Sequence, residues 1–149
     1  MGAIKHVHEK NFTVDAKGKD SRMMKEAGAS TVVLLSQNEL AVIKRVNEDT
    51  LRLGEILEIF RKEKMDYVLV EGLYRKFSKK RGMIKILCAK NENDAKSLLT
   101  VSPRPVCIVG RFANGSDERS FEGIPLLKLP KSTGSLLAYV KGAKSAGSK

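Results

Sequence analysis

The sequence predicts an α/β protein in which a mostly parallel sheet is flanked by helices. Short apolar runs rich in Val, Ile and Leu alternate with amphipathic segments along the chain. Several of these runs lack polar alternation, which is typical of strands buried on both faces. We expect a single domain over residues 1–140 and a flexible basic tail over residues 141–149.

Seven apolar runs are expected to be strands, because each is short and rich in large aliphatic residues. In an α/β sheet, ligands bind at the carboxyl ends of the strands, so the residues that follow these runs are candidates for a site. The runs are Ala3–Val7, Thr31–Ser36, Leu40–Val46, Tyr67–Val70, Met83–Ala89, Val106–Val109 and Ile124–Leu127.

Four helices are expected between or after these strands, because apolar residues recur there at helical spacing. The longest has acids near its start and bases near its end, which matches the helix dipole. They run from about Ser21 to Ala27 with Asp20 as cap and Gly28 as stop, from Leu51 to Lys64 with Asp49 or Thr50 as cap, from Asn91 or Asn93, and from Ser132 or Thr133.

The composition describes a basic globular chain of 149 residues that is 42% hydrophobic. No apolar run approaches the ~20 residues of a membrane span, and the first residues lack the apolar core of a secretory signal. A cytoplasmic protein is therefore expected. Cys88 and Cys107 lie in apolar runs, so we expect buried free thiols and no disulfide.

The net charge of +11 is concentrated in two segments. Tyr74–Arg81 holds five bases and no acid, and the chain after Glu122 holds five lysines and no acid. The first segment follows an expected strand end, so we interpret it as phosphate recognition. The alternatives are a solvated loop and a non-catalytic module for an anionic partner, which would be a pterin phosphate, an acidic protein or, least expected of the three, nucleic acid. Nucleic acid is not expected, because the run is short.

Two histidines close to the chain start form the first candidate group. His6 and His8 are two apart, so on a strand they share a face and meet a phosphate or a metal together. The alternative is a pair of half-exposed histidines at a strand end. A structural zinc site usually takes four protein ligands, and no neighbouring cluster supplies the others.

The segment Asp15–Ser21 is the second candidate. Lys19, the hydroxyl of Ser21 and the start of the following helix would form a corner that favours an anion. Asp20 would cap that helix or hold Mg²⁺ through water. An ordinary capped turn is the alternative.

The third candidate is the strand end at Glu71 and Gly72. Glu71 would orient a magnesium-bound water or an attacking water, and Gly72 would let the backbone approach a phosphate. The alternative is a surface acid followed by a turn glycine. The chain contains neither G-x-x-x-x-G-K-[ST] nor G-x-G-x-x-G, and no Ser-His-Asp or Cys-His constellation is suggested.

Two segments together resemble a known family. IKHVHEKNFTVDAKGKDSRMMKEAGA is similar to the I-K-H-x-H-H…D-x-x-G-K-D-S…AGA stretch of the molybdopterin-guanine dinucleotide biosynthesis protein B family (MobB). DYVLVEG resembles that family's D-L-[IV]-L-V-E-G element. The resemblance covers roughly Ala3 to Gly72 and is only topological beyond that point.

The resemblance implies a P-loop NTPase-like fold and an accessory role in molybdenum cofactor biosynthesis. It implies binding of GTP with Mg²⁺, weak GTPase activity, and a partner, the molybdenum cofactor guanylyltransferase (protein A of the pathway). Whether this chain is an enzyme stays open. Carried over, the catalytic and magnesium-holding residues would be Glu71 and Asp20, and the nucleotide or anion would be bound by His6, His8, Asp15, Lys19, Ser21, Gly72, Arg75 and Lys76.

The chain also departs from the family pattern. The family's first strand, P-loop and first helix precede the I-K-H segment, so we expect this chain to lack them. Glu9 stands where the family has the second histidine of its H-H pair. We expect a fragment, one half of a split protein or a degenerate member with impaired nucleotide binding. A homodimer or a complementary P-loop-bearing chain would then complete the fold.

Overall fold

The computed structural model describes the chain except for residues 10, 48–49, 75–81, 103 and 147–149. The chain divides into two compact units, Met1–Gly72 and Leu73–Lys149. Most of the basic run after Tyr74, with Arg75 and Lys76, lies outside the described residues, as does the end of the basic tail. Within the described part, no helix is both long and apolar enough to cross a membrane.

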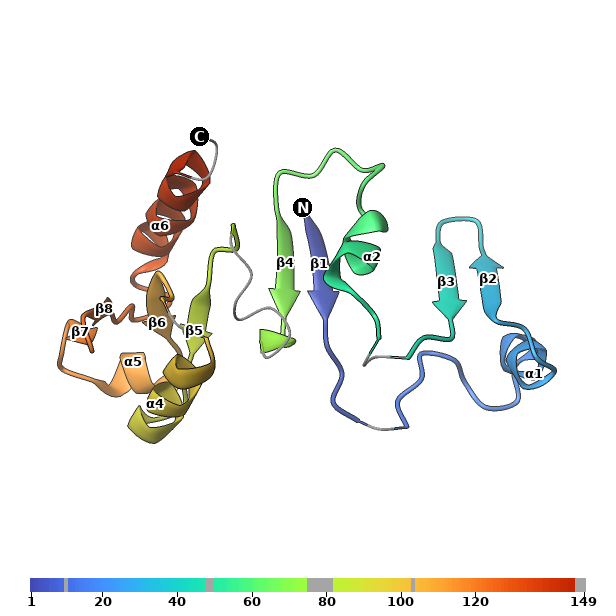
Figure 1. The fold of residues 1–149 in the computed structure, drawn as a ribbon, viewed down its shortest axis with the longest axis horizontal. Coiled ribbons are helices and arrows are strands. Elements are labelled where there is room, and N and C mark those ends of the chain that lie inside the picture. Colours follow the sequence, from blue (N-terminus) through green and yellow to red (C-terminus); the bar gives the residue numbers. More distant parts are fainter. Residues whose placement is uncertain (10, 48–49, 75–81, 103, 147–149) are drawn as a thin grey trace. The chain divides into compact units, whose positions relative to one another are not determined.

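The first unit contains two pairs of strands and two helices (Figure 1). Its outer strands in sequence, β1 and β4, pair in parallel, so their carboxyl ends meet at one edge. A parallel pair needs a crossover connection, and the helices and the second strand pair lie within it. The elements are β1 (Gly2–Lys5), α1 (Asp20–Glu26), β2 (Thr31–Leu35), β3 (Leu40–Lys44), α2 (Leu53–Glu58) and β4 (Val68–Glu71).

The strands β2 and β3 form an antiparallel hairpin. The connection is too short for a parallel crossover, and its turn is closed by Ser36, whose amide donates to the Glu39 carbonyl at 2.9 Å. The expectation of strands buried on both faces is wrong here, because Leu35 is 81% exposed and Leu40 is 66% exposed. Only Val32 of the two strands is buried.

Both helices of the first unit begin differently from the sequence prediction. The residue before α1 is Lys19, in an extended conformation without a side-chain cap, so the prediction of Asp20 as cap is wrong. The residue before α2 is Arg52, and its amide donates to the Glu55 carboxylate at 3.3 Å. Thr50 is therefore not the cap, and Asp49 lies outside the described residues.

The helix α2 is also shorter than expected. After Glu58 the chain continues in turns closed by bonds between residues three apart, such as the Arg61 amide to the Glu58 carbonyl at 3.1 Å. Such bonds wind the chain more tightly than an α-helix, and runs of them are short. The helical pattern up to Lys64 is thus only partly realised as α-helix.

The second unit combines a parallel strand pair with helices and a small hairpin (Figure 1). The strands β5 and β6 are parallel, whereas β7 and β8 are antiparallel and joined by a turn with positive φ at Glu122 and Gly123. The elements are β5 (Ile86–Cys88), α4 (Glu92–Val101), β6 (Cys107–Val109), α5 (Arg111–Gly115), β7 (Ser120–Phe121), β8 (Ile124–Pro125) and α6 (Thr133–Ala146). The expected α/β fold is confirmed, although the strands form four separate pairs among the described residues.

The second unit has a buried apolar core. It is built from the strands, from Ala95 of α4 and from Ala113 of α5, both fully buried. The prediction of Asn91 as cap of α4 is confirmed, since its side-chain oxygen accepts from the Asp94 amide at 2.9 Å. Cys107 is buried as expected, but Cys88 is exposed, so that prediction is wrong. Strand alternation explains this, because Leu87 is the residue of β5 that faces the core.

Candidate functional site

The carboxyl edge of the β1–β4 pair brings several candidate residues together. Lys5 and Glu71 are register partners at the ends of the two strands. The Lys5 ammonium lies 2.6 Å from a Glu71 carboxylate oxygen, and the His6 amide donates to the Glu71 carbonyl at 3.0 Å. Glu71 thus stands at a strand end, as the sequence predicts, with a cation beside it.

The environment keeps Glu71 ionised. The hydrogen bond from Lys5 is the largest influence and lowers the pKa of the Glu71 carboxyl. Burial is the next influence and acts in the opposite direction, and electrostatic interactions with Lys5, His8 and His6 lower the pKa further. A carboxylate of lowered pKa accepts hydrogen bonds or a cation at neutral pH and is unsuited to be a proton donor. The chemistry available at Glu71 is therefore orientation of a water or a cation.

Gly72 is held against His6 in a way that only glycine permits. Its φ is +78°, and a Cβ at this position would lie 2.8 Å from the Cβ of His6. The His6 ring nitrogens are buried, and the rings of His6 and His8 meet edge to face with centroids 4.4 Å apart. Although β1 ends at Lys5, the two histidines still lie together, and the backbone of Gly72 lies beside them.

The Asp15–Ser21 segment forms a second group. Asp15 is only 6% exposed, and it accepts a 2.6 Å hydrogen bond from the Ser21 hydroxyl. Its amide donates to the Thr13 hydroxyl at 3.1 Å. The other carboxylate oxygen of Asp15 is buried and has no hydrogen-bond partner among the described residues. Asp15, not Asp20, is therefore the acid that organises this turn.

The remaining candidates are less constrained. Lys19 and Asp20 are exposed at the start of α1, and Arg75 and Lys76 lie outside the described residues. In the part of the chain that the structure describes, no three His, Cys, Asp or Glu side chains gather as a metal cage. Mg²⁺ often needs only one or two carboxylates together with water and phosphate oxygens. The buried, unsatisfied oxygen of Asp15 and the ionised Glu71 are the groups that fit such a cation.

Sequence reasoning missed two residues of these groups. Lys5 pairs with Glu71 across 66 positions, and only the parallel register reveals that neighbour. Thr13 holds the Asp15 amide from two residues away, a local pattern that Ser and Thr commonly make at turns. The second contact could have been found from sequence, and the first could not.

Comparison with solved structures defines the class of the fold. A crystal structure of Bacillus subtilis MobB superposes with a TM-score of 0.67 at 19% identity, covering 93% of this chain and 78% of that one. A MobB homologue from Bacillus stearothermophilus gives 0.62 at 17% identity, covering 97% and 77%. The chain is thus an α/β protein with the P-loop NTPase-like fold of these structures, as the sequence predicts.

The family follows from the sequence comparison. The profile of the family described as molybdopterin guanine dinucleotide synthesis protein B matches residues 1–110, and the chain belongs to that family. The molybdopterin-guanine dinucleotide biosynthesis adapter protein of Haemophilus influenzae is 39% identical over 72 residues, which is 48% of this chain and 39% of that protein. The adapter of Escherichia coli K12 is 36% identical, over 48% and 41%. The match spans less than half the length of either relative.

Proposed function

We propose that this chain is a guanine-nucleotide-binding adapter that assists the attachment of a guanine nucleotide to molybdopterin. The observation that carries the proposal is the edge at which Gly72 approaches His6 beside the ionised Glu71. This edge lies within the stretch matched by the family profile. Both curated relatives carry the name of a molybdopterin-guanine dinucleotide biosynthesis adapter, which supports the same role here.

The chain's own residues divide the work at this site. The Gly72 backbone allows close approach of a phosphate. Anion binding is shared by His6, His8 and Lys19. The Asp15–Ser21 bond fixes the turn before α1. Arg75 and Lys76 follow directly in sequence and add positive charge. Mg²⁺, when bound, would neutralise charge on the phosphates. Glu71 and Asp20, which is exposed at the start of α1, are proposed to orient water on it and to support slow hydrolysis of GTP. The unsatisfied oxygen of Asp15 is proposed as a further acceptor for the cation or its water.

The proposed partner is the molybdenum cofactor guanylyltransferase, with both proteins acting in the cytoplasm. A second polypeptide is also proposed to cover the β2–β3 hairpin, either another copy of this chain or a chain that bears a P-loop. Support comes from the exposed aliphatic side chains on the hairpin, including Val33 at 57% and Val42 at 59% exposure. Contiguous apolar surface of this kind is typical of protein interfaces.

Calorimetric titration of the chain with GTP in the presence of Mg²⁺ tests the nucleotide proposal. We expect binding in the micromolar range for the wild-type chain and at least tenfold weaker binding for Gly72→Ala, which displaces His6. Gly123→Ala, in the second unit, is the matched control, because Gly123 also has positive φ but no atom lies within 4 Å of its added Cβ. Absence of heat with the folded wild-type chain, or equal effects of the two substitutions, would contradict the proposal.

A further inference from the structure

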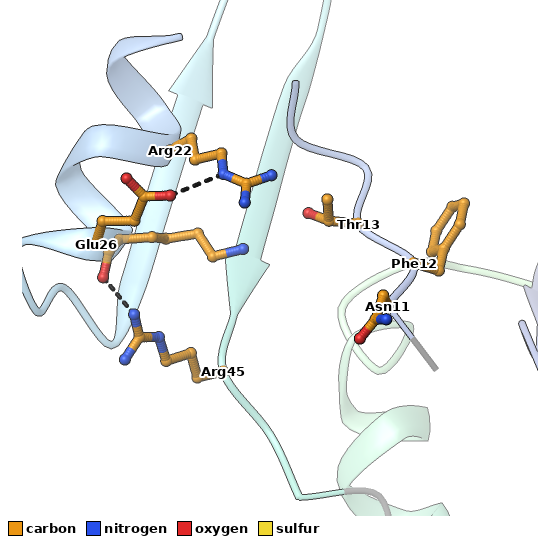
Figure 2. A pocket seen from close by; sticks show the side chains of 7 residues that line it. Asn11, Phe12, Thr13, Arg22, Glu26 and Arg45 are labelled. Carbon is orange, nitrogen blue, oxygen red and sulfur yellow. Dashed lines mark hydrogen bonds and ion pairs between the residues drawn. The ribbon is translucent and has the colours of Figure 1, made fainter. Parts of the chain in front are cut away.

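A cavity of about 430 Å³ opens in the first unit, beside α1 (Figure 2). This volume lies in the range of small-molecule sites. The lining comes from the loop after β1, from α1 and from the residue that follows β3. It consists of Asn11, Phe12, Thr13, Arg22, Lys25, Glu26 and Arg45. His6, Asp20, Glu71 and Gly72 are not part of it, and the cavity shares with the candidate site only Thr13, which holds the Asp15 amide.

The cavity has an excess of positive charge. Three cationic side chains line it together with a single carboxylate, that of Glu26. Arg22 bonds Glu26 at 2.9 Å through Nε alone, which leaves both terminal amino groups of its guanidinium for another acceptor. Figure 2 shows the end of the Arg22 side chain extending past Glu26. The single carboxylate is thus engaged without using the part of Arg22 best suited to an anion.

Arg45 and Lys25 supply the other two charges. One terminal amino group of Arg45 donates to the backbone carbonyl of Lys25, which ties the end of β3 to α1 (Figure 2). The Arg45 amide also donates to the Ser30 carbonyl at 3.0 Å. Among the described residues, no carboxylate forms an ion pair with the Lys25 ammonium. Arg45 is therefore positioned by the fold, and Lys25 adds a charge that none of the carboxylates in the described part of the chain pairs with.

An aromatic ring lines the same cavity, on the side opposite Arg22 and Arg45 (Figure 2). Phe12 is 52% exposed and its amide is fixed by a 3.1 Å bond to the Glu9 carbonyl. Its neighbour Thr13 accepts from the Asp15 amide and keeps its hydroxyl proton to donate. A flat ring can stack on an exposed phenylalanine, whereas a phosphoryl group matches forked guanidinium donors.

We infer that this cavity binds a phosphate monoester of a flat aromatic or heteroaromatic compound. The phosphoryl oxygens accept from Arg22, Lys25 and Arg45, and the ring lies against Phe12. This inference goes beyond the proposed nucleotide site, because the side chains that hold the ligand, those of Arg22, Lys25, Arg45 and Phe12, are not assigned to that site, and GTP need not bind there.

Backbone amide NMR of the ¹⁵N-labelled chain, titrated with phenyl phosphate, tests this inference residue by residue. We expect shifts concentrated at Thr13, Lys25 and Arg45, and weaker binding of inorganic phosphate at the same amides. Lys25→Gln and Arg45→Gln should each weaken phenyl phosphate binding at least tenfold. Phe12→Leu should remove the preference for phenyl phosphate over inorganic phosphate. Lys62→Gln, at an exposed lysine outside the lining, is the matched control and should bind as the wild type does.

Three results would overturn the inference. These are shifts confined to His6, Glu71 and Gly72, shifts scattered over exposed lysines, and equal binding by Lys25→Gln and Lys62→Gln. Failure here is distinguishable from failure of the adapter proposal, because the calorimetric response to GTP and Mg²⁺ is a separate measurement. If both proposals hold, Lys25→Gln loses phenyl phosphate binding and keeps the response to GTP.

Discussion

The two units differ in what holds them together. Every residue of the two buried apolar clusters belongs to the second unit, among them Leu87, Ile108 and Leu126. In the described part of the first unit, Val32 is the one large apolar residue that is buried. Its exposed large apolar residues are Met1, Phe12, Val14, Met23, Met24, Val33, Leu34, Leu35, Leu40, Val42, Val46, Leu57, Ile59 and Leu69.

This difference separates the scaffold from the site. The second unit is stabilised by burial of apolar surface, the main favourable contribution to folding. The first unit carries the candidate site and depends on strand pairing and on polar contacts such as the Asp15–Ser21 bond. We therefore expect the first unit to gain the most from a bound ligand or partner, because anything that binds only the folded state stabilises it.

The largest expected loss of stability comes from opening a cavity in the core of the second unit. Ile108 is fully buried, so Ile108→Ala should lower the free energy of unfolding by ~2–5 kcal/mol. Val33→Ala, in the first unit, removes an exposed side chain and should change it by no more than ~0.5 kcal/mol. Urea unfolding followed by circular dichroism measures both. Equal losses would mean that the two units are packed alike.

The next largest difference is expected between glycine-to-alanine substitutions at one tight turn in each unit. Gly110 has a φ of +96°, and a Cβ there would lie 2.8 Å from the Ala89 carbonyl oxygen. Gly110→Ala should lower the free energy of unfolding by ~1–3 kcal/mol through backbone strain. The clash of the added Cβ with the Ala89 carbonyl oxygen should lower it further. Gly18→Ala, in the first unit, meets no atom within 4 Å and should cost only the ~1–2 kcal/mol of the left-handed conformation. Thermal unfolding of the two variants compares them, and a larger loss for Gly18→Ala would contradict the packing described for Gly110.

Removal of a polar contact probes the first unit directly. Ser21→Ala takes away the 2.6 Å donor to Asp15 and leaves that buried carboxylate unsatisfied. We expect a loss of ~1–3 kcal/mol, confined to the first unit. Limited proteolysis should show faster cleavage before Gly72 and unchanged cleavage after it. An unchanged pattern, in the presence of a correctly folded second unit, would show that the bond does not organise this segment.

The smallest expected effect concerns pH. The pKa of Glu71 is lowered from its ordinary value of 4.5, so its pairing with Lys5 stabilises the folded state above that pH. The contribution is lost as the pH falls through the lowered pKa, because the unfolded state then binds the proton more strongly. Both side chains are exposed, so the effect is small and weakens with salt. Between pH 3 and 6, the free energy of unfolding should depend less on pH for Glu71→Gln than for the wild type. Glu63→Gln should show the same pH dependence as the wild type.

Local patterns in the sequence predicted most of the elements, and long-range register decided the rest. The strand that ends at Glu71 and the cap at Asn91 follow from neighbouring residues alone. The neighbours of Glu71 depend on pairing between β1 and β4, which no local pattern specifies. The prediction of a buried Cys88 is wrong because an apolar run does not reveal which face of a three-residue strand is covered. The candidate site was therefore predictable as single residues, whereas its arrangement was not.

Hydrogen exchange followed by mass spectrometry, with and without GTP and Mg²⁺, tests the contrast between the two units most directly. Without nucleotide, we predict slower exchange for residues 107–109 of the second unit than for residues 2–6 of the first. With nucleotide, protection should rise at residues 2–8, 15–21 and 68–72 and stay unchanged at residues 107–127. Equal protection of the two units without nucleotide, or a nucleotide effect confined to the second unit, would contradict the assignment of scaffold and site.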